Sequence, residues 1–336
     1  MNFTLPCDYK IETLDKLFCT SVKYGNRVVE VYGNLPEFMP IGNGRGYIAS
    51  NEKLKALEKF VRYAAGKGIE FNYTINASCT ENLELISSGQ KRIVDGMDRL
   101  ISMGIKKYTV ASIPLVKLLR YIYKDKIKIT LSTIANVNSV NRAVQAEKLG
   151  VDAIVLGEDE TRNIPLIKNI RKSVKCDIEI IVNSMCLWNC LYRQSHYNSL
   201  AHMKKEKQTE TSFYPNQCYI VKRDNPVERI KSPWIRPEDL SKYNELGIDL
   251  FKIIGREISQ TADWTRMLEI YCKGDYDGNL SELLYGFSEK GEIYLDNKSF
   301  EGFVDYFFNN EYKCFDICGT GKCNYCQEYY ENAIRI

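Results

Sequence analysis

The 336-residue sequence predicts an α/β fold, a (β/α)₈ TIM-barrel-like domain with a C-terminal cysteine-rich extension. Eight candidate strands occur, and a helix pattern follows each of them within roughly 250 residues, a length typical of such barrels. The candidate strands are continuous apolar runs, as parallel strands buried on both faces require. A doubly wound open sheet is the competing topology.

The elements alternate along most of the chain. Strands are expected over 28–32, 69–75, 108–111, 127–131, 153–156, 178–182, 230–235 and 250–254. Helices are expected over 51–65, 91–103, 114–123, 139–149, 163–174, 237–246 and 260–271, several of them ended by glycine. Residues 1–25 are weakly patterned and predict an irregular lead-in. The glycine-rich segment 41–46 lacks the lysine of a phosphate-binding loop, which favours a structural turn.

Residues 276–336 do not continue this alternation. Aromatic and acidic residues dominate there until the cysteine-rich tail. We therefore expect a barrel domain over residues 1–275 and an appended segment over residues 276–336.

The composition predicts a cytoplasmic protein with metal or redox chemistry. A net charge of +3 neither indicates nor excludes a nucleic-acid partner. The N-terminus lacks a signal-peptide pattern, and no apolar stretch approaches the ~20 residues that a membrane span needs. Because disulfides do not persist in a reducing cytosol, the 12 cysteines point to metal binding or redox work.

Residues 183–202 follow the expected strand 178–182 and hold the most reactive set of side chains. Cys186, Cys190 and Arg193 would share one face if residues 186–193 were helical. The polar stretch 203–216 could fold Cys218 back to them as a loop. Three thiolates suit an iron–sulfur site, and with His196 they would suit tetrahedral zinc.

Polar residues also follow the other expected strands, where a barrel carries its catalytic groups. They are Asn76 and Cys79, Ser132 and Thr133, Asn183 and Cys186, and finally Gly255, Arg256 and Glu257. Cys186 and Arg256 would then face one cavity. The catalytic candidates are Asn183, Arg193, His196, Arg256 and Glu257: the arginines would balance charge, and His196 or Glu257 would move protons. A solvated ion pair is the alternative for Arg256 and Glu257.

The tail holds a second group of thiols, Cys314, Cys318, Cys323 and Cys326, with Gly319 and Gly321 among them. Four thiols within thirteen residues, with glycines that permit tight turns, indicate metal binding. Two interpretations stay open: a separate zinc or cluster site, or a fourth ligand for the mid-chain thiols.

The second half of the chain resembles the U32 family, historically called peptidase U32 or collagenase-like. The matching positions are Glu179, Cys186, Cys190, Cys218, Lys252, Gly255 and Arg256. The chain departs from the family pattern at Asn183-Ser184, where the family has His-Gly, and at Ser241, where the family often has a cysteine ligand. These departures leave the fourth ligand open.

The resemblance implies a barrel that carries a [4Fe–4S] cluster and performs oxygen-independent hydroxylation or related redox modification. Relatives modify transfer RNA, ribosomal RNA or a quinone precursor, and some of the RNA enzymes use prephenate. The substrate here would be an RNA, a peptide or a small molecule, and a redox protein could be a partner. One alternative is a U32-type peptidase, cysteine-dependent through Cys190 and His196 or metal-dependent. Another is a non-enzymatic adaptor with a zinc-bearing tail.

Overall fold

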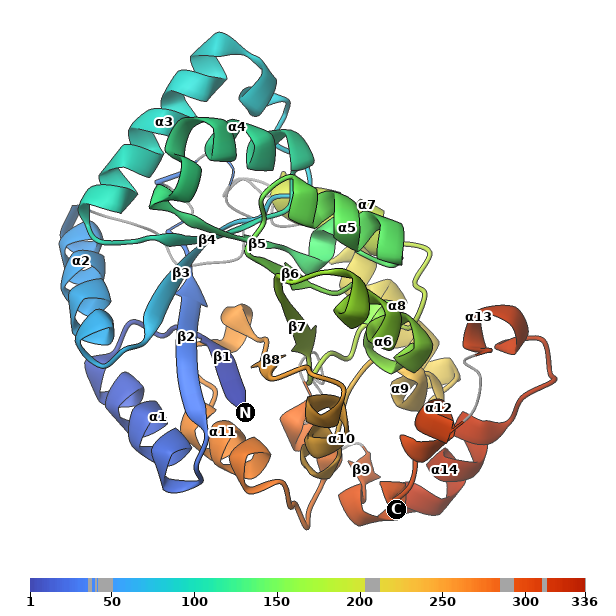
Figure 1. Cartoon of the computed structure of the whole chain (residues 1–336). Coiled ribbons are helices and arrows are strands. Elements are labelled where there is room, and N and C mark those ends of the chain that lie inside the picture. Colours follow the sequence, from blue (N-terminus) through green and yellow to red (C-terminus); the bar gives the residue numbers. More distant parts are fainter. Residues whose placement is uncertain are drawn as a thin grey trace.

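The computed structural model describes residues 1–35, 38, 39, 41, 51–202, 212–284, 293–309 and 313–335. Eight parallel strands pair in chain order and close into a barrel, which confirms the predicted fold class (Figure 1). The strands are β1 (Asn2–Pro6), β2 (Arg27–Gly33), β3 (Glu70–Ile75), β4 (Lys107–Val110), β5 (Lys128–Leu131), β6 (Ala153–Val155), β7 (Asp177–Ile181) and β8 (Leu250–Lys252). Residues 42–46 of the expected glycine-rich turn lie outside the described residues.

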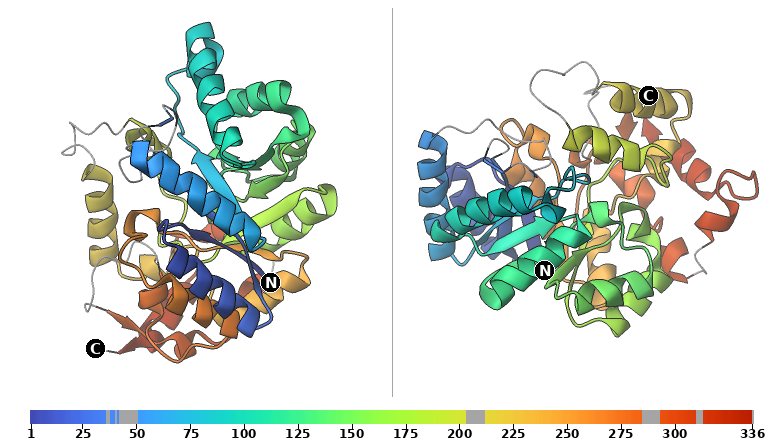
Figure 2. Two further views of the ribbon diagram at one scale, coloured as in Figure 1. Left: turned by 90° about the vertical axis from the view of Figure 1, so that its left-hand side faces the viewer. Right: turned by 90° about the horizontal axis from the view of Figure 1, so that it is seen from above.

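Helices surround the strands on their outer side (Figure 2). Those that follow β1 to β6 are α1 (Ile11–Lys23), α2 (Asn51–Gly66), α3 (Ser87–Ser102), α4 (Ile113–Tyr123), α5 (Val140–Lys148) and α6 (Ile164–Ser173). Between β7 and β8 come α7 (Arg193–Ala201), α8 (Phe213–Asp224), α9 (Glu228–Lys231) and α10 (Leu240–Glu245), and α11 (Trp264–Lys273) follows β8. The long β7–β8 connection carries all three mid-chain cysteines.

The start of the chain corrects one expectation. Residues 1–25 are not an irregular lead-in, because β1 pairs with both β2 and β8 and so closes the barrel. Leu14 and Leu17 of α1 are buried and Ser21 continues the same stripe, at helical spacing. The helical pattern of α1 is weak in the sequence because few apolar residues mark its buried face.

The expected strand 230–235 is also wrong. Its first residues belong to α9, and β7 pairs directly with β8. Ile230 and Ile235 are fully buried, so their apolar character reflects packing in the layer outside the strands. Trp234 forms a single antiparallel bridge with Asn183 instead of a strand.

The barrel interior contains two buried ion pairs where such barrels usually hold branched apolar residues. Lys107 lies 2.7 Å from Glu30, and Lys252 lies 3.0 Å from Glu179. Glu30 and Lys107 come from non-adjacent strands, so their contact crosses the interior. Asn72 extends the first pair by donating a 3.0 Å hydrogen bond to Glu30.

The C-terminal segment packs beside α9 at the edge of the barrel (Figure 1). Its elements are β9 (Tyr294–Leu295), α12 (Asp305–Asn309), α13 (Cys314–Ile317), α14 (Tyr325–Ala333) and β10 (Ile334–Arg335). The Phe303 ring stacks on Trp234 at 5.4 Å, and the Arg162 guanidinium lies 4.8 Å from the same Phe303 ring. The boundary expected at residue 275 stays a prediction.

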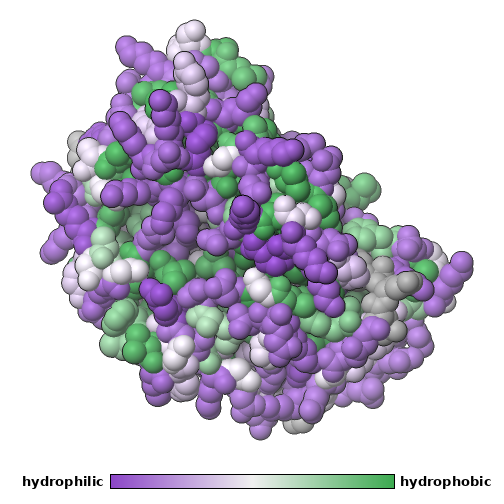
Figure 3. Space-filling model, viewed as in Figure 1, coloured by the Kyte–Doolittle hydropathy of each residue, from purple (hydrophilic) through white to green (hydrophobic). Residues whose placement is uncertain are grey.

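Hydrophilic side chains cover most of the face drawn in Figure 3, and apolar ones occur there in small groups. In the part of the chain that the structure describes, no helix is both long and apolar enough to cross a membrane.

Replacing Glu30 by alanine should lower the free energy of unfolding by about 3 kcal/mol. The buried Lys107 ammonium would lose its close partner and keep only the longer, 3.7 Å pair with the partly exposed Glu70. Glu58→Ala is the matched control, since Glu58 also lies 2.7 Å from a cation, Arg62, but on the surface. It should cost about 0.5 kcal/mol. Urea unfolding of the two variants measures both losses, and equal losses would contradict the stabilising role of the interior pair.

Candidate active site and its cysteines

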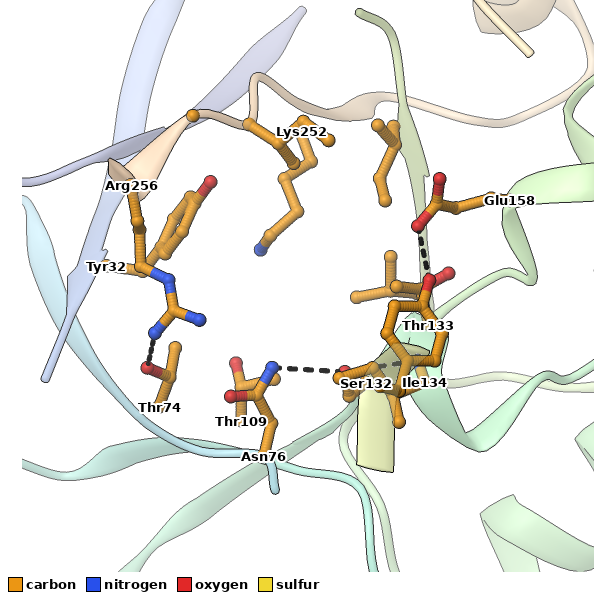
Figure 4. A pocket seen from close by; sticks show the side chains of 15 residues that line it. Tyr32, Thr74, Asn76, Thr109, Ser132, Thr133, Ile134, Glu158, Lys252 and Arg256 are labelled. Carbon is orange, nitrogen blue, oxygen red and sulfur yellow. Dashed lines mark hydrogen bonds between the residues drawn. The ribbon is translucent and has the colours of Figure 1, made fainter. Parts of the chain in front are cut away.

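A cavity of about 90 Å³ opens at the carboxyl ends of the barrel strands (Figure 4). Several residues predicted from their place after a strand line it: Asn76, Ser132, Thr133, Gly255 and Arg256. Sequence reasoning missed other lining residues, which are Tyr32, Thr74, Thr109, Glu158, Tyr197 and Lys252 among the polar ones. Cys79, Asn183 and Cys186 do not line the cavity, so the expectation that Cys186 and Arg256 both face it is wrong.

Two cations point into one side of the cavity (Figure 4). The Arg256 guanidinium donates to Thr74 and, at 3.3 Å, to the side-chain oxygen of Asn34. The Lys252 ammonium is held by Glu179 and lies 4.3 Å from the centre of the Tyr32 ring. This side of the cavity therefore offers cationic donors to an anionic or strongly polar group, while Glu179 already offsets the charge of Lys252.

Two asparagine amides near these cations each have one buried atom that makes no hydrogen bond within the described residues. Asn76 donates to Ser132 at 3.4 Å, but its buried Oδ1 has no hydrogen-bond partner among the described residues. The buried Nδ2 of Asn34 likewise has none within the same ranges. Buried polar atoms normally have partners, so these atoms mark positions where a ligand or water would bind.

Glu158 faces the opposite side of the cavity and is buried (Figure 4). It accepts hydrogen bonds of 2.6 Å from Ser184 and from Tyr197, and a further one from the Cys186 thiol. Burial acts to raise the pKa of Glu158, but the Arg193 charge and these hydrogen bonds together lower it below its ordinary value. A carboxylate thus joins the cavity to the cysteine segment.

The cysteine segment itself is not a helix. α7 begins only at Arg193, and Asn189 has a φ of +50° that no α-helix contains. The backbone N–H of Asn189 donates to Asp159 at 2.7 Å, which holds this turn. Cys186 and Cys190 therefore do not lie on one helical face, and the predicted alignment with Arg193 fails for that reason.

The thiols of Cys190 and Cys218 nevertheless meet. Cys218 lies on α8; residues 203–211 of the expected loop are outside the described residues, and residues 213–216 already belong to this helix. The hydrogen bond from the Cys218 thiol lowers the pKa of Cys190 to about 6, and raises that of Cys218 well above its ordinary value. Burial and the Glu158 charge raise the pKa of Cys186 to about 12.

Two cations lie beside these thiols. The Lys222 ammonium interacts electrostatically with Cys186, Cys190 and Cys218, and it donates to the backbone carbonyl of Met185. Arg193 pairs with Asp159 at 2.8 Å and also interacts with Glu158 and Cys186. Negative charge on the sulfurs would therefore be offset locally.

The remaining predicted catalytic residues lie elsewhere. Asn183 is fully buried, and its amide both donates to and accepts from the backbone of Ile254 at 3.0 and 2.8 Å, which fixes the ends of β7 and β8. The His196 ring stacks on Tyr214 of α8, with centroids 5.3 Å apart. Glu257 follows Arg256 in a short 3₁₀ helix, and its side chain is outside the described part of the chain.

The tail cysteines gather beside the mid-chain segment. Cys314, Cys318 and Cys326 line a second, smaller hollow together with Asp159 and Trp188. Burial raises the pKa of Cys326 to about 12. Neither here nor at the mid-chain thiols do three or more His, Cys, Asp or Glu side chains of the described ranges stand ready to hold a metal ion.

Comparison with known proteins agrees with the resemblance found in the sequence. The model of "Peptidase family U32" matches residues 19–313. A protein of Methanocaldococcus jannaschii named as an uncharacterized protease is 32% identical over 329 residues, which cover 97% of this chain and 95% of that protein. The solved structure of a U32 peptidase aligns with 76% of this chain and 92% of its own at a TM-score of 0.54 and 19% identity.

In the reduced, metal-free protein, iodoacetamide should label Cys190 with a midpoint near its pKa of about 6. Its thiolate is present above that pH and is the reactive form. Removing the donor by Cys218→Ala should move the midpoint up toward about 8.5. Mass spectrometry of labelled peptides across pH measures both midpoints, with exposed Cys19 as the reference thiol. Identical midpoints for Cys190 in the two proteins would contradict the hydrogen bond.

Proposed function

This chain belongs to peptidase family U32, and we propose that it is an enzyme that modifies a small polar group beside an iron–sulfur cluster. The reacting group would bind in the cavity at the barrel mouth. Cys186, Cys190 and Cys218 would hold the cluster. The reaction would be an oxygen-independent hydroxylation or a related redox modification.

The contact between the Cys190 and Cys218 thiols carries this proposal. The two residues come from different segments of the β7–β8 connection, yet their sulfurs are in hydrogen-bonding contact. Thiolates are the ligands that iron–sulfur clusters prefer, and three of them would leave one iron without a protein ligand. Through Cys186 and Glu158, this group of thiols adjoins the cavity.

The donor set fits a cluster in its chemistry and in its charge balance. Lys222 and Arg193 would offset the negative charge of the thiolates and the cluster. The Cys186 thiol donates a hydrogen bond to Glu158 in this structure. It would lose that hydrogen bond when its sulfur binds an iron of the cluster. Ser184 and Tyr197 would continue to hold the Glu158 carboxylate in place.

A bound [4Fe–4S] cluster would supply one-electron chemistry. In a hydroxylation that takes its oxygen from water, the substrate loses two protons and two electrons, and a redox partner protein would accept those electrons. The cavity residues would bind and orient the substrate. Arg256 and Lys252 would hold its anionic or polar part, and Glu158 would accept a hydrogen bond from the opposite side. A cavity of about 90 Å³ suits a small molecule, or one group that protrudes from an RNA or a peptide.

A thiol-dependent peptidase is the second candidate, because the low pKa of Cys190 favours a nucleophilic thiolate at neutral pH. The family description and the name of the Methanocaldococcus relative point the same way. Against it, neither histidine lines the cavity, and the His196 ring packs on Tyr214. This candidate requires peptide cleavage that alkylation stops and that needs no metal.

Protein purified without oxygen should contain about four irons and four sulfides per chain. The triple variant Cys186→Ala, Cys190→Ala, Cys218→Ala should lose them together with the visible absorption of the cluster. A control that changes Cys19, Cys79 and Cys176 to alanine removes the same number of thiols outside both cysteine groups and should keep the iron.

Iron and sulfide analysis with a visible spectrum decides the matter. Full iron content in the Cys186, Cys190, Cys218 variant would refute the assigned ligands. An iron-free wild-type protein that cleaves peptides until it is alkylated would replace the redox function by the peptidase.

A further inference from the structure

The cysteine-rich tail is not used by the proposed reaction. We propose that Cys314, Cys318, Cys323 and Cys326 form a second, separate site that holds one Zn²⁺ ion. This site would be structural, and the inference does not depend on the iron–sulfur proposal. Four thiolates around a tetrahedral ion are a common form of structural zinc site.

Cys314 and Cys318 come before the turn at Gly319–Gly321, and Cys323 and Cys326 come after it. Cys314, Cys318 and Cys326 line one hollow between the tail and the barrel. Cys326 interacts electrostatically with Cys314 and Cys318, and Cys318 interacts with Cys323. Two residues separate Cys323 from Cys326, a spacing common in zinc sites.

The hollow is small, which favours a single ion over a cluster. Its volume of about 30 Å³ is room for about two water molecules, because one water needs about 10–15 Å³ of such space. A cluster of four irons and four sulfides would require a larger rearrangement of the lining than one ion.

Cations adjoin the place that such an ion would take. Zn²⁺ with four thiolates carries a net charge of about −2. Arg162 and Lys231 line the same hollow, and Lys231 is also paired with Glu228 at 2.6 Å, so these two cations offset that charge in part. Asp159 also lines it, but its charge is paired with Arg193 at 2.8 Å.

The thiols are not yet gathered at ligand distance from one point in the described residues. The connection that would close around the ion can adjust, because Gly319 and Gly321 both have positive φ and open space on their side-chain side. α13 has only four residues, so it adds little resistance to this adjustment. Metal binding commonly orders short segments of this kind.

The ion would tie the tail to the segment that carries Cys186 and Cys190. Phe315 of α13 already packs on Trp188, with ring centroids 5.1 Å apart. Tyr325, next to Cys326, donates to the Phe303 carbonyl at 2.9 Å. A zinc ion at the four thiols would lock both contacts.

The test is metal analysis of the full chain, expressed with zinc and iron in the medium and purified without oxygen. The wild-type protein should hold about one zinc per chain. The variant Cys318→Ser, Cys326→Ser should hold less than about a tenth of that amount, because two ligands are lost. The Cys186, Cys190, Cys218 variant should keep its zinc whether or not the wild type carries iron.

Zinc retained by the Cys318, Cys326 variant would overturn the assignment. So would a loss of iron, in place of zinc, from that variant, because the tail would then hold a cluster. Should that variant fail to fold, zinc K-edge absorption of the wild type still tests the site. It should show four sulfurs at about 2.3 Å, and a shell that includes nitrogen or oxygen would overturn the four-thiolate assignment.

Discussion

The connection between the cavity and the cysteine segment depends on one buried carboxylate, that of Glu158. Glu158 stands directly after β6, and the hydrogen bonds that reach it come from Ser184 after β7, from Tyr197 on α7 and from the Cys186 thiol. A buried charge without such partners would be costly, so the Ser184 and Tyr197 donors must be in place whenever the barrel is folded. The position of the cysteine segment relative to the cavity follows from this requirement. Glu158 therefore holds the cysteine segment in place and also presents a carboxylate to the cavity.

The barrel gives the cavity two chemically different sides. One side carries the cations Arg256 and Lys252, each fixed by neighbours that leave little freedom. The other side carries Glu158. A ligand that matches both sides would have an acidic or strongly polar end and a hydrogen-bond donor at the other, which restricts the substrate more than the family assignment does.

The sequence predicted those features that depend on local pattern. Apolar runs located seven of the eight barrel strands, and polar residues after them located Asn76, Ser132, Thr133 and Arg256 at the cavity. Glu158 was missed because an acidic run, Glu158-Asp-Glu160, is usually solvated surface, and only the closed barrel shows that it is buried. The contact between Cys190 and Cys218 could be expected from residue type alone, because both are cysteines that could share one metal site. The helical face proposed for Cys186 and Cys190 did not survive the left-handed turn at Asn189, which nothing in the pattern revealed.

The ion pairs inside the barrel bear on how the protein folds. Glu30 and Lys107 belong to strands separated by β3, and Thr4 reaches Glu179 from β1 across β8. The Lys252–Glu179 pair joins the adjacent strands β8 and β7, but Thr4 can reach Glu179 only when β1 lies beside β8. The Glu30–Lys107 pair likewise forms only when β2, β3 and β4 are all in place. Partly assembled sheets are disfavoured, because unpaired buried charge costs several kcal/mol. Closure of the barrel by β1 should then be favoured by the hydrogen bond that it completes at the buried Glu179 carboxylate.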